Sequence, residues 1–138
     1  MISMVGRASS RAIHPFHAAM LAGTVPLFLG TLLADYAYWS SFQIDWSNFA
    51  SWLIVGALVF GAIALLCALI DMFRGRGSLF YTVVLAATWV LGFCNALIHA
   101  KDAWAIMPAA LVLSVLTAVL ACVATWIGFS SLRAGAAT

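Results

Sequence analysis

Four long stretches of the chain are almost entirely apolar, and the polar residues gather in the short segments between them. Asp35, near the end of the first stretch, is the only charged residue within them. An α-helix rises about 1.5 Å per residue, so about 20 mostly apolar residues cross the hydrocarbon core of a bilayer, which is about 30 Å thick. The pattern therefore predicts four membrane-spanning helices, over residues 15–36, 50–70, 79–98 and 105–128.

The apolar stretches fit helices and not the strands of a barrel. They do not alternate apolar with polar residues, and a bilayer holds no water for backbone groups that lack partners. We therefore predict an all-α integral membrane protein, a single domain over residues 1–138, with its four helices in an up-down bundle. Pro15 and Pro108 fall in the first turns of predicted helices, whereas Pro26 is interior and is predicted to kink the first helix.

Composition supports a membrane protein and limits what else the chain can be. Hydrophobic residues make up 66% of it and charged residues 7%, against about 45–50% and about 25% in soluble domains. With 138 residues there is no room for a catalytic domain outside the membrane, so we expect no enzymatic activity and no catalytic residue. The net charge of +2 does not indicate nucleic-acid binding.

The positive charges predict an orientation. Five arginines lie on one side of the predicted spans and Lys101 alone lies on the other, and cytoplasmic segments retain Lys and Arg. Both termini are therefore predicted to be cytoplasmic. The apolar run after the N-terminal arginines exceeds the about 7–15 residues of a signal-peptide core, so we predict an uncleaved first span. The five are Arg7, Arg11, Arg74, Arg76 and Arg133.

Aromatic residues are denser on the predicted outer side. Trp and Tyr favour both membrane interfaces, so this asymmetry is explained if the rings anchor the helices in the bilayer. The alternative hypothesis is a docking surface for a periplasmic partner on the outer loop over residues 38–52, where aromatic residues are spaced among Ser, Gln and Asn. The candidate docking residues are Tyr38, Trp39, Trp46 and Trp52.

His14, His17 and His99 are the candidate cofactor-binding residues, because membrane helix bundles hold haem through histidines. His17 and His99 are predicted to differ by roughly 27 Å in membrane depth, so one haem cannot join them. His14 and His17 share a helical face and could bind a metal together. Two ligands do not complete a site, and the alternative is that both are polar interface residues, so no metal site is predicted.

A candidate polar cluster combines Asp35 with Asn95 and His99. Asn95 and His99 are four residues apart on one helical face, and all three lie in the outer part of the bundle. Ionisable residues within a span suggest function, although these lie close enough to the interface to be solvated. The cluster is expected either to take up protons near a quinone headgroup or to hold helices together.

Other motifs give little further chemistry. Cys67, Cys94 and Cys122 lie singly in three apolar stretches, without the spacing of a disulfide framework or a zinc site. Small residues on the second and fourth helices permit close helix packing, although there is no strict GxxxG motif. Phosphate loops, an HExxH motif and paired broken helices are absent, so protease, ATPase and typical transporter mechanisms lack support.

Several short motifs resemble the bacterial membrane family named domain of unknown function 2231. The resemblance covers about residues 13–133 and implies a four-helix protein of the bacterial inner membrane. It rests on the pair His14-Pro15, on Pro26, Asp35, Gly61 and Asp71, and on the sequence Trp126-Ile127-Gly128.

The same resemblance suggests partners. Members of the family look like neighbours of, or fusions to, quinoprotein sugar dehydrogenases of the sorbosone type and cytochromes c. By the same resemblance, many members carry a histidine just before the third helix, where this chain has Arg76-Gly77-Ser78-Leu79 instead. That departure puts a haem or metal role shared with the family in doubt here.

The leading hypothesis is a non-catalytic membrane subunit that anchors a periplasmic quinoprotein dehydrogenase or cytochrome c, or relays electrons for it. One alternative is an electron-transfer protein that binds haem b or quinone, although the sequence implies no cofactor firmly. Another is a small-solute channel or transporter that works as an oligomer.

Overall fold

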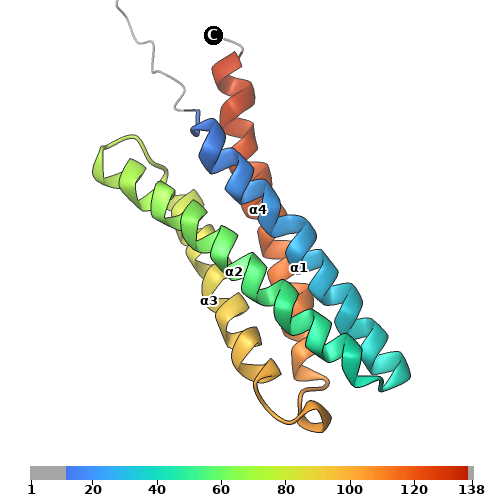
Figure 1. Cartoon of the computed structure of the whole chain (residues 1–138). Coiled ribbons are helices and arrows are strands. Elements are labelled where there is room, and N and C mark those ends of the chain that lie inside the picture. Colours follow the sequence, from blue (N-terminus) through green and yellow to red (C-terminus); the bar gives the residue numbers. More distant parts are fainter. Residues whose placement is uncertain (1–11, 137–138) are drawn as a thin grey trace, which may run out of the picture.

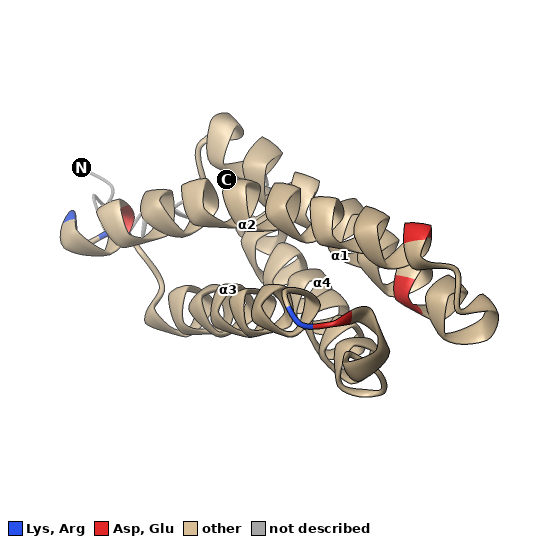
Figure 2. Ribbon diagram, turned by 60° about the horizontal axis from the view of Figure 1, so that its bottom comes forward, with Lys and Arg blue, Asp and Glu red and all other residues tan. Residues whose placement is uncertain are grey.

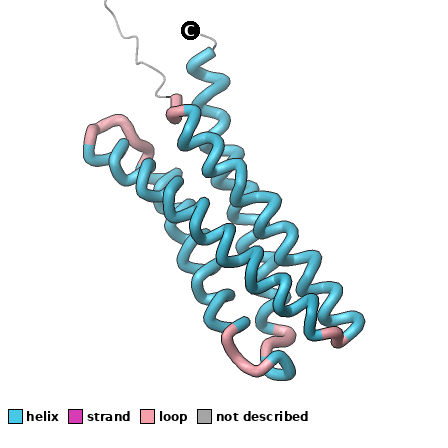
Figure 3. Tube along the Cα trace, viewed as in Figure 1, coloured by secondary structure: helices cyan, strands magenta, loops and turns pink. Residues whose placement is uncertain are grey.

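The computed structural model describes residues 12–136, and these residues form helices joined by short connections (Figures 1 and 3). No strand occurs in this part of the chain. Arg7 and Arg11, on which the predicted orientation partly rests, lie outside it. The elements are α1 (Pro15–Ser41), α2 (Ile44–Phe73), α3 (Leu79–His99), the 3₁₀ helix η1 (Ala103–Ala105) and α4 (Ala109–Ala136).

The four α-helices run alternately up and down, as Figure 1 shows. Each packs against its neighbours in sequence, and α4 returns to pack against α1, so the bundle is closed. All four helices are long and apolar enough to cross a membrane. The predicted all-α bundle of four spanning helices is therefore confirmed.

The connection between α1 and α2 is much shorter than predicted. Only Phe42 and Gln43 separate the two helices. Phe42 adopts the left-handed conformation (φ 55°) that often ends a helix, and its N–H donates to the carbonyl of Tyr38 at 2.7 Å. The expected outer loop over residues 38–52 is thus wrong: this segment is a helical hairpin tip. With 27 residues, α1 is about 40 Å long, which exceeds the hydrocarbon core by about 10 Å.

The start of α4 also differs from the prediction. Residues 103–105 form η1, and α4 begins only at Ala109, so Pro108 lies just before the helix and not in its first turn. The Met107–Pro108 peptide bond is cis. At the other end α4 continues to Ala136, well beyond residue 128, because the Ser and Arg residues there are compatible with a helix that extends past the hydrocarbon.

Small residues fill the interior of the bundle. Ala57, Ala121 and Ala124 are almost fully buried, and they bring the helix backbones close together. Large apolar side chains such as Val59 and Leu66 are 54% and 60% exposed on the outside, where a bilayer would cover them. The arrangement is the reverse of a soluble bundle, in which large apolar side chains occupy the core.

The charged residues gather at the two ends of the bundle (Figure 2). Apart from Asp35, those described lie in the first or last turn of a helix or in a connection. We call the end with Arg74, Arg76 and Arg133 the cationic end; it holds the α2–α3 turn and the end of α4. We call the opposite end, with the α1–α2 turn and η1, the aromatic end.

Candidate functional site

Three helices bring a buried polar cluster together near the aromatic end. Asp35 comes from α1, Asn95 and His99 from α3, and Ser114 from α4. One oxygen of the Asp35 carboxyl group lies 2.8 Å from Nε2 of His99, and the other accepts a hydrogen bond from the hydroxyl of Ser114. The amide nitrogen of Asn95 donates to Ser114 at 2.9 Å. These hydrogen bonds tie α1, α3 and α4 to one another.

The geometry fixes how many protons the pair of Asp35 and His99 holds. Nδ1 of His99 lies 2.9 Å from the backbone carbonyl of Asn95, which can only accept, so Nδ1 carries a hydrogen. Nε2 and the carboxyl oxygen then share one further proton. Whether that proton resides on the imidazole or on the carboxyl group, the pair has no net charge. A neutral pair removes much of the cost of burying two ionisable groups in a bundle.

Burial of this cluster differs from the sequence-based expectation. Asp35 and Asn95 are 0% exposed, and the side chain of His99 is 1% exposed. The expectation that these groups are solvated at the interface is therefore wrong. Because α1 continues to Ser41, Asp35 lies nearly two turns before its end. The three residues predicted to share this part of the bundle do meet there.

Ser114 was missed, although it completes the cluster. It is fully buried and lies between Asp35 and Asn95. The predicted limits hid it, because Ser114 lies nine residues after the start of the fourth predicted stretch, whereas Asp35 lies one residue before the end of the first. With the observed limits, Ser114 follows the start of α4 by five residues and Asp35 precedes the end of α1 by six, so the two lie at a similar depth.

The aromatic residues at the hairpin tip divide into exposed and buried ones. Trp39, Trp46 and Trp52 are 44%, 40% and 76% exposed. Tyr38 is 2% exposed, and its hydroxyl donates to the carbonyl of Ala103 at 2.9 Å. Its assignment as a docking residue is therefore wrong. Tyr38 instead joins the hairpin tip to the α3–α4 connection by a hydrogen bond.

The three candidate histidines have separate surroundings. His14 caps α1, with Nδ1 accepting from the N–H of Phe16, and it is exposed. His17, in the first turn, is buried, and its Nε2 lies 2.8 Å from the hydroxyl of Tyr81. His99 lies at the aromatic end with both ring nitrogens engaged. Within residues 12–136 no three His, Cys, Asp or Glu side chains are grouped as metal ligands.

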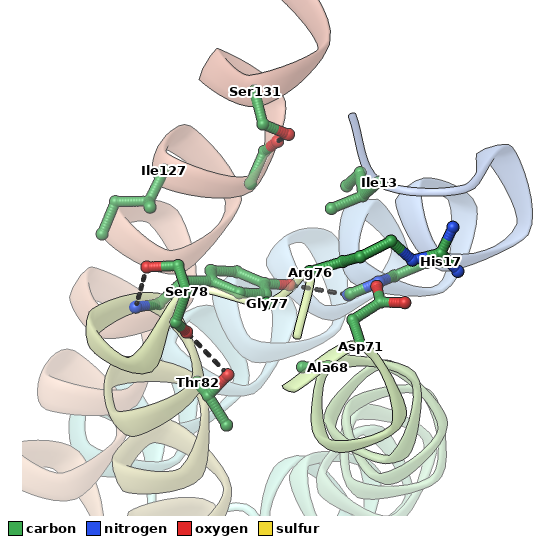
Figure 4. A pocket seen from close by; sticks show the side chains of 12 residues that line it. Ile13, His17, Ala68, Asp71, Arg76, Gly77, Ser78, Thr82, Ile127 and Ser131 are labelled. Atoms are coloured by element: carbon green, nitrogen blue, oxygen red, sulfur yellow. Dashed lines mark hydrogen bonds and ion pairs between the residues drawn. The ribbon is translucent and has the colours of Figure 1, made fainter. Parts of the chain in front are cut away.

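A cavity of about 310 Å³ opens at the cationic end, where Figure 4 shows side chains from all four helices and the α2–α3 turn pointing into one space. His17 reaches it from α1, Asp71 from the end of α2, Arg76 from the turn and Tyr81 from α3. Nδ1 of His17 is 4.0 Å from the Asp71 carboxylate, which is beyond hydrogen-bond distance. The remaining lining includes the apolar side chains of Ile13, Ala68 and Ile127.

The sequence did not predict this cavity as a site. The sequence offers His17 and Asp71 as polar residues, whereas Tyr81 is one aromatic residue among many and Arg76 contributes to the predicted orientation. Cys67, Cys94 and Cys122 are unpaired, and none of them is in the lining of the cavity. The chemistry at this end therefore comes from oxygen and nitrogen groups.

Comparison with known proteins identifies the chain's family. A family model described as "Predicted membrane protein (DUF2231)" matches residues 13–133, which is most of the chain. No curated protein and no solved structure matches the chain. The match and the four apolar helices agree, and the chain belongs to the DUF2231 family of predicted membrane proteins.

Proposed function

We propose that this protein is a non-catalytic, multi-pass subunit of the bacterial inner membrane that anchors a redox protein at its periplasmic face. The observation that carries the proposal is the surface at the aromatic end. Its exposed rings belong to the tip of the α1–α2 hairpin and to η1, and we call this surface the aromatic platform. It consists of Trp39, Phe42, Trp46, Phe49 and Trp104.

The aromatic platform is held rigidly by contacts beneath it. Tyr38 bonds to the backbone at Ala103, and the buried side chains of Ile106 and Ala110 pack against Tyr38. The ring of Phe42 stacks on Trp104, with centroids 6.4 Å apart and planes 16° from parallel. A fixed surface loses little conformational entropy when a partner binds, and rigid aromatic side chains are the commonest anchors of protein interfaces.

The orientation supports a periplasmic partner. Among the described Lys and Arg residues, Arg74, Arg76 and Arg133 lie at the cationic end and Lys101 alone lies at the aromatic end. Under the positive-inside rule the aromatic platform then faces the periplasm. A quinoprotein dehydrogenase or a cytochrome c, the partners that the family resemblance suggests, would meet it there.

Haem b has less support than anchoring. A haem iron needs a histidine nitrogen that is free to bind it. Both nitrogens of His99 already have partners, which leaves only the histidines of the cationic end. His17 and His99 also lie at opposite ends of the bundle. We expect the purified protein to be colourless, and a Soret band in its absorption spectrum would restore the haem hypothesis.

Isolation from native membranes in mild detergent tests the anchoring proposal. A peripheral protein that alkaline carbonate releases should accompany the wild-type chain. Its yield should fall at least about tenfold when Trp39 and Trp46 are both changed to Ala. Each interface aromatic commonly contributes about 1–2 kcal/mol or more, and about 1.4 kcal/mol corresponds to a tenfold change in affinity. The matched control is Phe73→Ala, which removes an aromatic ring that is 91% exposed at the cationic end.

Two results would count against anchoring. One is a wild-type protein that leaves native membranes without any peripheral partner. The other is a partner recovered equally well with the double variant and with Phe73→Ala, since binding would then not use the aromatic platform.

A further inference from the structure

The cavity at the cationic end has the chemistry of a ligand site. We propose that it binds the headgroup of a neutral, carbonyl-bearing amphiphile of the quinone class, with the hydrogen-bonded pair of Tyr81 and His17 donating one hydrogen bond to a carbonyl oxygen. The cavity lies at the opposite end from the aromatic platform. Its test is therefore independent of the anchoring proposal.

An unsatisfied buried nitrogen is the first argument. His17 is 1% exposed, and its Nδ1 makes no hydrogen bond within the part of the chain that the structure describes. A buried polar atom without a partner destabilises the fold. His17 lines the cavity, and a ligand oxygen toward which the imidazole turns would give Nδ1 its missing partner.

Tyr81 is paired with His17 at the wall of the cavity. Its hydroxyl lies 2.8 Å from Nε2 of His17, and the two rings are 5.8 Å apart between centroids. Either group can hold the hydrogen of this bond, depending on the tautomer of the imidazole. The pair can thus present a donor to a carbonyl oxygen while the hydrogen bond between them keeps both rings in place.

Charge in the cavity argues for a neutral headgroup. Arg76 and Asp71 are the charged residues in the lining, and their charges cancel. A phosphate group would meet the carboxylate of Asp71 as well as the guanidinium of Arg76, whereas anion sites usually gather several cationic or N–H donors. A carbonyl compound gains hydrogen bonds from the donors without repulsion from Asp71.

Position and size argue for an amphiphile. The cavity lies where α1 begins and α2 ends, hence near the predicted level of the lipid headgroups, and Ile13, Ala68 and Ile127 give it apolar walls. Its volume of about 310 Å³ is at the lower end of ligand pockets, which measure about 300–1,000 Å³. That space suits a single substituted ring and leaves a long tail to the surrounding bilayer.

Calorimetric titration of the purified full-length protein in detergent tests the proposal, with decylubiquinone as the probe. We expect saturable binding by the wild type. Tyr81→Phe removes only the hydroxyl and should weaken binding about tenfold, which corresponds to about 1.4 kcal/mol for one hydrogen bond. The matched control is Tyr36→Phe, which removes the same hydroxyl from a ring that is 61% exposed on the outside of α1, and it should bind as the wild type does.

A second variant keeps the test meaningful if Tyr81→Phe does not fold. Arg76→Gln changes an exposed turn residue of the lining and should weaken binding several-fold. No saturable heat with the wild type would overturn the proposal, and so would binding that neither cavity variant changes.

A separate titration with phosphatidylglycerol distinguishes a quinone site from a phospholipid site. If the lipid bound in a Tyr81-dependent manner and excluded decylubiquinone, the cavity would be a phospholipid site and the proposal would fail.

Discussion

At the scale of single residues, the cluster around Asp35 shows how a carboxyl group can lie inside a membrane bundle. Its two oxygens are both hydrogen-bonded, one to His99 and one to Ser114. The pair of Asp35 and His99 is neutral whichever residue holds the shared proton. Such a network makes the three helices interdependent, because removal of any member leaves a buried partner without its hydrogen bond.

We expect Asp35→Ala to lower the free energy of unfolding by about 3 kcal/mol, since loss of one partner from a buried pair leaves the other uncompensated. Denaturation by sodium dodecyl sulfate in mixed micelles measures the change. The control is Asp45→Ala, at an exposed position on the first turn of α2, with an expected change within about 0.5 kcal/mol.

A double-mutant cycle with His99→Ala separates the pair from general packing. The two substitutions should be coupled by about 1 kcal/mol or more, because the residues share a proton. Additive effects would show that Asp35 and His99 do not act as a pair.

At the scale of helices, the sequence predicted the spans more accurately than their ends. The limits of α3 agree with the prediction to within one residue, because Ser78 caps its start and His99 ends its apolar run. The limits of α1 and α2 do not, since hydropathy measures the length that fits in lipid, whereas the helices continue through Trp, Ser and Asn residues at the interface. A hydropathy analysis therefore does not show how short the connections between helices are.

The rotation of each helix about its axis could also not be predicted from the sequence. The four helices are apolar on all sides, so no amphipathic stripe indicates which face is buried. Asn95 and His99 could be paired by their spacing of four, because that relation lies within one helix. The contacts of Ser114 with Asp35 and of Tyr81 with His17 join different helices, and they depend on rotations that only the packed structure shows.

Close approach of helices at glycine gives a prediction at this scale. A Cβ atom at Gly92 would lie 2.9 Å from the ring of Phe28, whereas one at Gly56 would lie 3.5 Å from Leu27, an ordinary contact. We expect Gly92→Ala to destabilise the bundle by about 1–3 kcal/mol through overpacking. Gly56→Ala should be neutral or stabilising by up to about 1 kcal/mol, because alanine favours helix.

Thermal unfolding in one detergent compares the two glycine variants directly. Equal stability of the two would contradict the packing described here, since both exchange the same atoms within a helix and differ only in the neighbours that the new methyl group meets.

At the scale of the whole molecule, the two ends of the bundle carry different chemistry. The cationic end holds an open cavity, and the aromatic end holds a closed polar cluster beneath exposed rings. If the protein lies in the inner membrane as proposed, the cavity is at the cytoplasmic side and the aromatic platform at the periplasmic side. The anchoring proposal depends on this orientation, whereas ligand binding in the cavity does not.

Single cysteines test that orientation in a background where Cys67, Cys94 and Cys122 are replaced by Ala. In intact cells, a maleimide that does not cross membranes should label Lys101→Cys, in the α3–α4 connection. Arg74→Cys, just after α2, should be labelled only after the cells are permeabilised. The reverse pattern would place the aromatic platform in the cytoplasm.

Photocrosslinking in living cells tests most directly whether the aromatic platform holds a partner. Benzoylphenylalanine placed at Trp46 should form an adduct with one peripheral periplasmic redox protein, whereas the same group at Phe73, at the cationic end, should not. Adducts with that protein at both positions, or at neither in cells that contain it, would contradict anchoring at the aromatic platform.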